Sequence, residues 1–104
     1  NGSFRTYTPM EVDLGGIMDY SLEQNFPNPF NPETMIRYQI PEKSRVSLKV
    51  FDILGNEIIT LVNSVHEAGG YEIKFDARGL SSGVYIYRIM TDKFSADRKL
   101  VIIK

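Results

Sequence analysis

The chain has 104 residues, of which 42% are hydrophobic, and carries a formal net charge of −1. This length holds one small domain with a short additional segment, and the near-neutral charge gives no basic face for nucleic acid. The absence of cysteine excludes disulfide bonds and thiol chemistry, and no apolar run approaches the roughly 18 residues that span a bilayer.

Residues 1–19 differ in pattern from the rest of the chain. A weak alternation over residues 4–8 is broken by Pro9, and two glycines follow at positions 15 and 16. We interpret this segment as the last strand of a preceding domain followed by a linker. These residues show no basic-then-apolar leader pattern, and we expect the chain to be a piece of a longer protein. The alternative is a native N-terminal arm of the same domain. A strand separated from its own sheet is expected to fray or to pair with a neighbouring edge.

Residues 25–32 read Asn-Phe-Pro-Asn-Pro-Phe-Asn-Pro and organise the chain that follows. Each proline lacks a backbone donor and fixes φ, and it pushes the residue before it towards extended geometry. We therefore predict a stiff, mostly extended ribbon with Asn-Pro turns. Phe26 and Phe30 are its only large apolar groups and are expected to anchor it to the core, with Phe30 favoured over Phe26 for burial. A proline-rich linker is the alternative, although such linkers are usually richer in Gly, Ser or charged residues. The prolines are Pro27, Pro29 and Pro32.

Short alternating segments follow the ribbon. The first two strands after it are joined by about four residues and predict a hairpin. The segment at residues 84–90 is the most apolar and is expected to be central, whereas residues 63–70 are expected to be a polar loop. Gly55 and Gly83 are expected at turn positions that need backbone freedom. Strands are expected at residues 20–26, 34–40, 45–51, 57–62, 71–76, 84–90 and 94–103.

Seven short strands about ten residues apart, without any helical period, predict an all-β fold. The expected architecture is an Ig-like antiparallel β-sandwich of about seven strands, formed by residues 20–104. Residues 1–19 lie outside it as linker and strand remnant.

No catalytic or metal site is expected. His66 is the only histidine, and without cysteine or a second histidine it completes neither a nucleophile–base pair nor a zinc site. We expect it to be a solvated loop residue. Oxygen-bearing side chains at one end of the sandwich could hold calcium, but no loop shows the regular Asp-x-Asp-x-Asp-Gly spacing of a calcium-binding loop. Those side chains are Asp52, Asn56, Asp76, Asp92 and Asp97.

Six tyrosines and six phenylalanines leave open a carbohydrate-binding or adhesive accessory module of a secreted enzyme. Such a module needs an exposed row of aromatic side chains. Most of the aromatics here fall at inward strand positions, so a core role is favoured. Phe51 and the strand of Tyr85 and Tyr87 are the places where a stacking platform is expected if that interpretation is wrong.

Four motifs together resemble the C-terminal sorting domain of the type IX (Por) secretion system of Bacteroidetes and related phyla. The resemblance covers about four-fifths of the chain, and the same fold class occurs in the Ig-like domain of flagellar hook-capping proteins. The motifs are the ribbon at 25–32, Leu-Lys-Val-Phe-Asp-Ile-Leu-Gly at 48–55, Gly-Leu-Ser-Ser-Gly-Val-Tyr at 79–85, and Lys-Leu-Val-Ile-Ile-Lys at 99–104.

The resemblance implies a non-catalytic domain that targets a larger cargo protein for export across the outer membrane. Its partners would be the outer-membrane translocon with its sorting machinery and covalently linked N-terminal cargo domains, and its location the secreted or cell-surface fraction. No cofactor, nucleic acid or transmembrane segment is implied, and the domain could be cleaved or retained. The family's recurring residues carry over to Pro27, Asn28, Pro29, Gly83, Tyr85, Lys99 and Lys104, with Phe26, Phe30, Pro32 and Gly55 as structural positions.

The C-terminal strand connects the expected fold to the expected function. Residues 100–103 are too apolar to be left in water and should pair into the sheet. Lys104 should then point into solvent as a basic tip for a receptor. A third hypothesis is a structural assembly domain of the hook-capping kind. There the proline-rich ribbon would be expected in mid-chain and not followed by a terminal lysine, so Lys104 favours the sorting domain.

Overall fold

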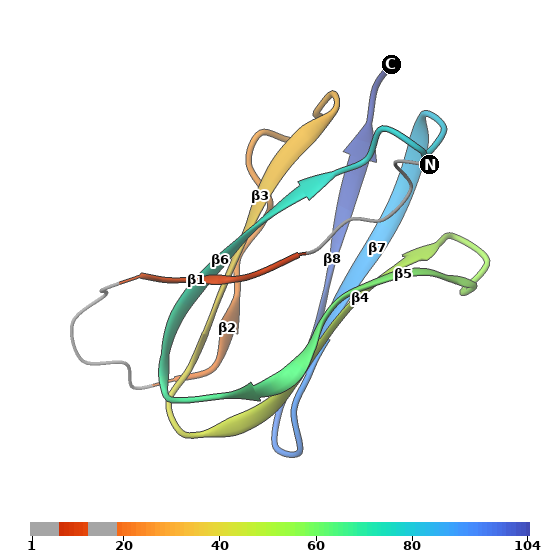
Figure 1. Ribbon diagram of the computed structural model, residues 1–104. Coiled ribbons are helices and arrows are strands. Elements are labelled where there is room, and N and C mark those ends of the chain that lie inside the picture. The colour runs from red at the N-terminus through yellow and green to blue at the C-terminus, as the bar shows by residue number, and fades with distance from the viewer. Residues whose placement is uncertain (1–6, 13–18) are drawn as a thin grey trace.

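The computed structural model describes residues 7–12 and 19–104, and these form two antiparallel four-stranded sheets packed face to face (Figure 1). The predicted all-β sandwich is confirmed, with eight strands in the described residues instead of about seven. The additional strand is β1. One sheet has the order β1-β6-β3-β2 and the other β5-β4-β7-β8. The strands are β1 (Met10–Val12), β2 (Ser21–Leu22), β3 (Glu33–Ile40), β4 (Ser44–Asp52), β5 (Glu57–His66), β6 (Gly69–Asp76), β7 (Gly83–Met90) and β8 (Ser95–Ile102).

Strict alternation of apolar and polar residues creates the core between the two sheets. In β3 every second side chain is buried, and β4 repeats this pattern from Val46 to Val50. Because successive side chains of a strand point to opposite faces, both of these strands contribute one apolar row to the interior. Each such side chain contributes about 1.5 to 3 kcal/mol when fully buried. The largest members with under 2% exposure include Tyr38, Tyr87, Phe75, Ile36, Leu48 and Leu100.

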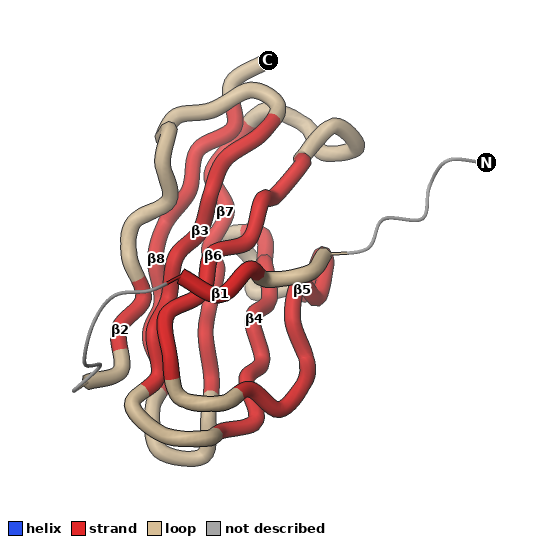
Figure 2. The backbone as a smooth tube through the Cα atoms, turned by 60° about the vertical axis from the view of Figure 1, so that its left-hand side comes forward, coloured by secondary structure: helices blue, strands red, loops and turns tan. Residues whose placement is uncertain are grey.

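The predicted hairpin between the first two long strands is wrong. β3 pairs with β6 along its whole length, whereas β4 pairs with β5 and β7 in the other sheet. The connection at residues 41–43 therefore crosses between the two layers, which are visible in Figure 2. Stacked sheets lie only about 10 Å apart, so a connection of this length can cross as easily as it can turn back. Alternation identifies the buried face of a strand but not its neighbour.

The predicted polar loop at residues 63–70 is also wrong. β5 continues to His66, and β6 begins at Gly69. Two register shifts against β4 interrupt the period of two in β5, and adjacent Leu61 and Val62 are both buried. The following residues of this edge strand are mostly exposed and polar, and in sequence they look like a loop.

His66 is a half-buried strand residue and not a solvated loop residue. Its Nε2 lies 2.9 Å from the hydroxyl of Tyr38, and its ring centroid is 4.6 Å from that of Tyr71. Since β5 belongs to one sheet and the two tyrosines to the other, the histidine joins the layers at the β5–β6 corner.

The N-terminal segment lies along the outer edge of β6. β1 pairs with β6 over Gly70 to Glu72. The Tyr7 hydroxyl donates to the carbonyl of Asp76 at 3.2 Å, and its ring centroid is 6.1 Å from that of Phe75. Residues 4–6 of the predicted remnant strand and residues 13–18, which include most of the predicted linker, lie outside the described residues.

Gly55 and Gly83 both have positive φ, at 91° and 153°. Gly55 lies in the β4–β5 turn, and Gly83 begins β7. The expectation that backbone freedom is required at these two positions is confirmed.

Candidate functional site

The proline-rich ribbon docks on the edge of β8 through Phe30. This side chain is only 3% exposed, and its backbone forms a parallel bridge with Ile102. The Phe30 amide donates to the carbonyl of Val101 at 3.0 Å, and the amide of Ile103 donates to the carbonyl of Phe30 at 3.0 Å. The predicted burial of Phe30 is therefore confirmed, and the ribbon is part of the sandwich.

Side chains of the ribbon extend this contact along β8. The Asn28 Oδ1 accepts from the amide of Val101 at 2.9 Å, and the Gln24 Nε2 donates to the carbonyl of Lys99 at 2.6 Å. An unpaired strand edge is a template for unwanted pairing with other chains. The ribbon therefore covers the edge that β8 would otherwise present.

Asn25 braces the ribbon from inside. Its side chain is buried, and its Nδ2 donates to the carbonyl of Pro27 at 3.1 Å and to Thr34 Oγ1 at 2.9 Å. The Thr34 hydroxyl donates to the same Pro27 carbonyl at 2.8 Å. A buried carbonyl without a partner would cost about 1–3 kcal/mol. Asn25 and Thr34 were missed as functional positions, although the first opens the motif and the second occupies an inward strand position.

Tyr87 connects the ribbon to the centre of the second sheet. Its hydroxyl accepts from the amide of Asn25 at 2.7 Å and donates to the carbonyl of Glu23 at 2.6 Å. Burial of the side chain raises the pKa of Tyr87 to about 12. The hydroxyl therefore remains a neutral donor and acceptor at any ordinary pH.

Phe26 does not anchor the ribbon with its side chain. Its backbone exchanges two hydrogen bonds of 3.0 Å with Met35, but the side chain is 79% exposed. The expectation that both phenylalanines are anchors holds for Phe30 only. Adjacent Pro27, Asn28 and Pro29 are also exposed. The three Xaa-Pro peptide bonds of the ribbon are cis, and the chain bends at the prolines instead of running straight.

Lys104 is exposed as predicted, but both its backbone and its side chain are held. Its amide donates to Ser82 Oγ at 3.0 Å, and its Nζ donates to the carbonyl of Arg78 at 2.8 Å. Ser82 and Arg78 both belong to the β6–β7 connection. The ammonium is therefore positioned on this connection and does not extend freely into solvent.

The Gly83 and Tyr85 motif pairs directly with the C-terminal strand. Gly83 is the partner of Ile102 and Tyr85 the partner of Leu100. The Tyr85 hydroxyl donates to the carbonyl of Ser81 at 2.9 Å and fixes the connection that holds Lys104. Leu100 and Ile102 are buried, as predicted for this segment.

Three predicted motifs thus converge at one place, which we call the ribbon–tail end (residues 25–32, 78–85 and 99–104). Figure 1 shows the C-terminus and the β6–β7 connection at the same end of the molecule. Pro32 belongs to it, since its carbonyl accepts from the amide of Ala77 at 2.8 Å. Gly55 lies in the separate β4–β5 turn. The Lys99 side chain lines a groove beside that turn.

Two of the candidate oxygen ligands are already engaged in other contacts. Asp52 accepts three hydrogen bonds within its own turn, and Asp97 pairs with Arg88 at 2.7 Å. The described residues contain no group of three or more histidine, aspartate or glutamate side chains that could hold a metal ion.

The candidate stacking rings are covered. Tyr85 and Tyr87 are buried, and the Arg88 guanidinium lies over the Phe51 ring at 5.1 Å from its centroid. Within the described residues, the positions named for carbohydrate stacking therefore form no exposed row of aromatic side chains.

The described residues contain no helix with the length and apolarity needed to cross a membrane.

Comparison with known families gives one result. The sequence model of the family described as "Secretion system C-terminal sorting domain" matches residues 24–104. No curated protein and no solved structure matches the chain. The matched range starts one residue before the ribbon and contains the whole ribbon–tail end.

Proposed function

Because this chain belongs to the family of secretion system C-terminal sorting domains, we propose that residues 20–104 direct a covalently linked cargo protein to the type IX secretion machinery. Sorting by a domain of this family is not a catalytic role. Residues 1–19 would be the linker and the last strand remnant of the preceding cargo domain. The short β1–β6 pairing supports this division, because a strand separated from its own sheet pairs with a nearby edge.

The observation that carries the proposal is the convergence at the ribbon–tail end. Asn28 and Val101 are 73 positions apart in sequence but share a hydrogen bond. Three motifs that are distant in sequence therefore form one surface. A partner that reads this surface would recognise the folded domain and not a linear peptide.

Within this surface we assign recognition to the exposed side chains Pro27, Asn28, Pro29 and Lys104. The Pro27 carbonyl is hydrogen-bonded by Asn25 and Thr34. The Asn28 side chain accepts from the Val101 amide, and the Lys104 amide donates to Ser82 Oγ. A preorganised surface loses little conformational entropy when a partner binds. Phe30, Pro32, Gly83 and Tyr85 would support this surface from below.

Export would take the cargo through the periplasm and across the outer membrane to the medium or the cell surface. The partners on this route would be the outer-membrane translocon and its sorting machinery. Both cleavage and retention of the domain are compatible with this role.

A secretion assay with a passenger protein fused in front of the chain tests the proposal. The host must carry a type IX secretion system, and the passenger is quantified in the periplasm and outside the cell. The intact fusion should be exported, and deletion of residues 20–104 should leave the passenger in the periplasm.

Two matched variants locate the recognition surface. Lys104→Met keeps the length of the side chain but removes its charge, and it should impair export while the chain stays folded. Lys43→Met removes an equally exposed charge distant from the ribbon–tail end and should export normally. Equal export of both variants would overturn the assignment of Lys104, and export after deletion of the whole domain would overturn the proposed function.

A further inference from the structure

The β4–β5 turn presents two aliphatic side chains to solvent. Ile53 is 71% exposed and Leu54 is 83% exposed. They end the Leu-Lys-Val-Phe-Asp-Ile-Leu-Gly motif, whose earlier residues Leu48 and Val50 are fully buried. A turn exposed to water gains nothing from two adjacent large apolar groups. Neither side chain belongs to the ribbon–tail end, so the proposed sorting surface does not explain why they are exposed.

This turn is fixed by Asp52. Its Oδ1 accepts from the amides of Leu54 and Asn56, each at 2.9 Å, and its Oδ2 accepts from Asn56 Nδ2 at 3.0 Å. Gly55 adopts the positive φ that closes the turn. The backbone that carries Ile53 and Leu54 is therefore held in one geometry, so a partner that covers them pays little ordering entropy.

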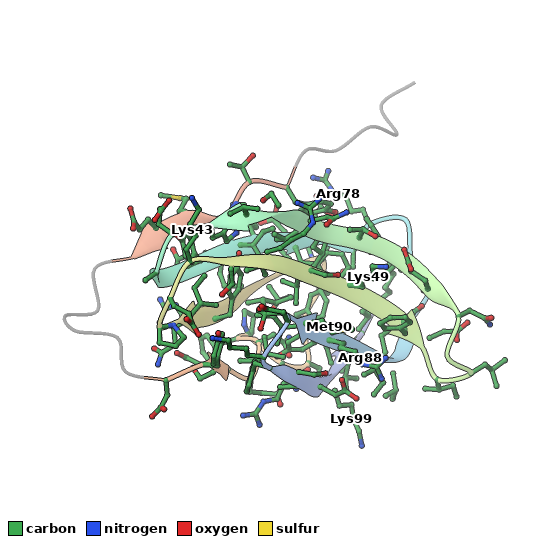
Figure 3. All side chains as sticks on the ribbon, turned by 90° about the horizontal axis from the view of Figure 1, so that it is seen from below. Lys43, Lys49, Arg78, Arg88, Met90 and Lys99 are labelled. Atoms are coloured by element: carbon green, nitrogen blue, oxygen red, sulfur yellow. The ribbon has the colours of Figure 1, made fainter. Side chains whose placement is uncertain are left out.

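A groove of about 370 Å³ adjoins the turn on the outer face of the second sheet. Across this face Phe51 of β4, Ile86 of β7 and Lys99 of β8 are successive cross-strand neighbours. The groove thus has an apolar floor that continues to Ile53 and a cationic rim. In Figure 3 the labelled Arg88 and Lys99 lie on the same side of the molecule, with Lys99 projecting away from the sheet.

The unpaired cation that this groove offers to a partner is the Lys99 ammonium. The two carboxylates of the groove are used internally, by Asp52 in the turn and by Asp97 in its ion pair with Arg88. Lys99, which also lines the groove, makes no ion pair within the described part of the chain. The Arg98 guanidinium instead donates to the carbonyl of Leu22 at 2.9 Å. A partner that brings carboxylates would therefore complement the groove, and one that brings cations would be repelled.

We propose that Ile53, Leu54 and the adjoining groove form a docking surface for a protein segment that combines aliphatic side chains with carboxylates. The aliphatic side chains of the partner pack on Ile53 and Leu54, and a carboxylate meets Lys99. Interfaces of this type concentrate their binding energy in a few central groups. This surface shares only Lys99 with the ribbon–tail end, and it goes beyond the proposed sorting function.

A binding experiment with the purified full chain tests the surface. The probe is a fluorescein-labelled peptide in which leucine and glutamate alternate, and its anisotropy is followed at low and high salt. A matched peptide of leucine and lysine is the control probe. The leucine–glutamate peptide should bind saturably with a Kd below about 1 mM, corresponding to −4.1 kcal/mol. Binding should weaken with salt, and the control peptide should not bind.

Variants assign the binding to the proposed residues. Leu54→Ser and Lys99→Glu should each weaken the Kd by about tenfold, equal to about 1.4 kcal/mol, without a change in melting temperature. The control Val65→Ser changes an apolar group that is also exposed, at 51%, and the control Lys43→Glu changes a distant lysine. Both should bind as the parent chain does.

Three outcomes would overturn the inference. One is the absence of saturable binding by the leucine–glutamate peptide, and another is equal binding of both peptides. The third is concentration-dependent dimerisation of the chain that Leu54→Ser abolishes, since a second copy would then be the occupant.

Discussion

Two phenylalanines four positions apart have opposite roles in the ribbon. Phe30 is buried against Phe75, whereas the ring of Phe26 is in solvent. Phe30→Ala should lower the free energy of unfolding by about 3 kcal/mol or more, because it removes buried apolar area and leaves a cavity. Phe26→Ala is the matched control and should stay within about 0.5 kcal/mol of the parent chain. In chemical denaturation, a loss below about 1 kcal/mol for Phe30→Ala would mean that the ribbon is not docked.

The Tyr87 hydroxyl is expected to stabilise the junction between ribbon and sheet. Tyr87→Phe keeps the ring but removes the group that joins the Asn25 amide to the Glu23 carbonyl. A buried amide left without a partner costs about 1–3 kcal/mol, and denaturant unfolding should show a loss of this size. Tyr20→Phe removes a hydroxyl that donates to the exposed Glu42 and should have little effect. Equal effects of the two variants would contradict the buried junction.

Tyr87 also predicts how stability depends on alkaline pH. Its pKa is raised from 10.0 to about 12 by burial, so the unfolded chain loses this proton before the folded chain does. The resulting stability is fully present below pH 10 and is lost as pH rises through about 12. The free energy of unfolding should therefore fall more steeply above pH 10 in the parent chain than in Tyr87→Phe. Burial also raises the pKa of Tyr38, so some slope should remain in the variant, but identical slopes would contradict this role of Tyr87.

Among the elements, those with one buried face could be predicted from sequence. β3, β4 and β6 were each expected within one or two residues of their bounds, because their apolar residues alternate. β7 was expected equally closely from its apolar run. The same alternation could not decide that β3 and β4 lie in different sheets. The predicted strand at residues 57–62 is shorter than β5, because the register shifts of β5 hide its period of two and its exposed end is polar.

The candidate site was predicted in its parts but not as an assembly. The ribbon, the Gly83 and Tyr85 motif and Lys104 could be named from the sequence, as could the burial of Phe30. Their convergence depends on pairings such as Asn28 with Val101, which no local pattern encodes. The brace formed by Asn25 and Thr34 was missed for the same reason, because polar residues reveal a buried role only when their partners are known.

The C-terminal strand offers a test with two adjacent isoleucines. Ile102 is 1% exposed and pairs with both Gly83 and the ribbon, whereas Ile103 is 54% exposed. Ile102→Asp places a charge in the core and should cost about 4 kcal/mol or more. Ile103→Asp should change stability only slightly. Thermal unfolding followed by circular dichroism separates the two, and similar melting temperatures would contradict the pairing of this strand with the ribbon.

At the scale of the whole molecule, segments outside the long strands cover one edge of each sheet. The ribbon covers the edge of β8, and β1 covers part of the edge of β6. β5 has an open edge in which two register shifts interrupt the regular ladder, and such bulges disfavour pairing with other chains. A sandwich closed in this way is suited to follow a cargo domain without aggregating with it.

The two edge covers should differ in importance. A chain that begins at residue 19 loses β1 and the Tyr7 contact, but it keeps every buried side chain from Leu22 to Ile102. We expect it to fold with a loss of about 1 kcal/mol, which lowers the melting temperature by roughly 4–8 °C in a domain of this size. Amide exchange should accelerate at the β6 residues that face β1, from Gly70 to Glu72, while the β3–β6 amides stay protected. A chain that begins at residue 33 lacks the ribbon and should fail to fold. Unfolding of the first chain, or folding of the second, would contradict a sorting domain that starts near residue 20 with the ribbon as an integral part.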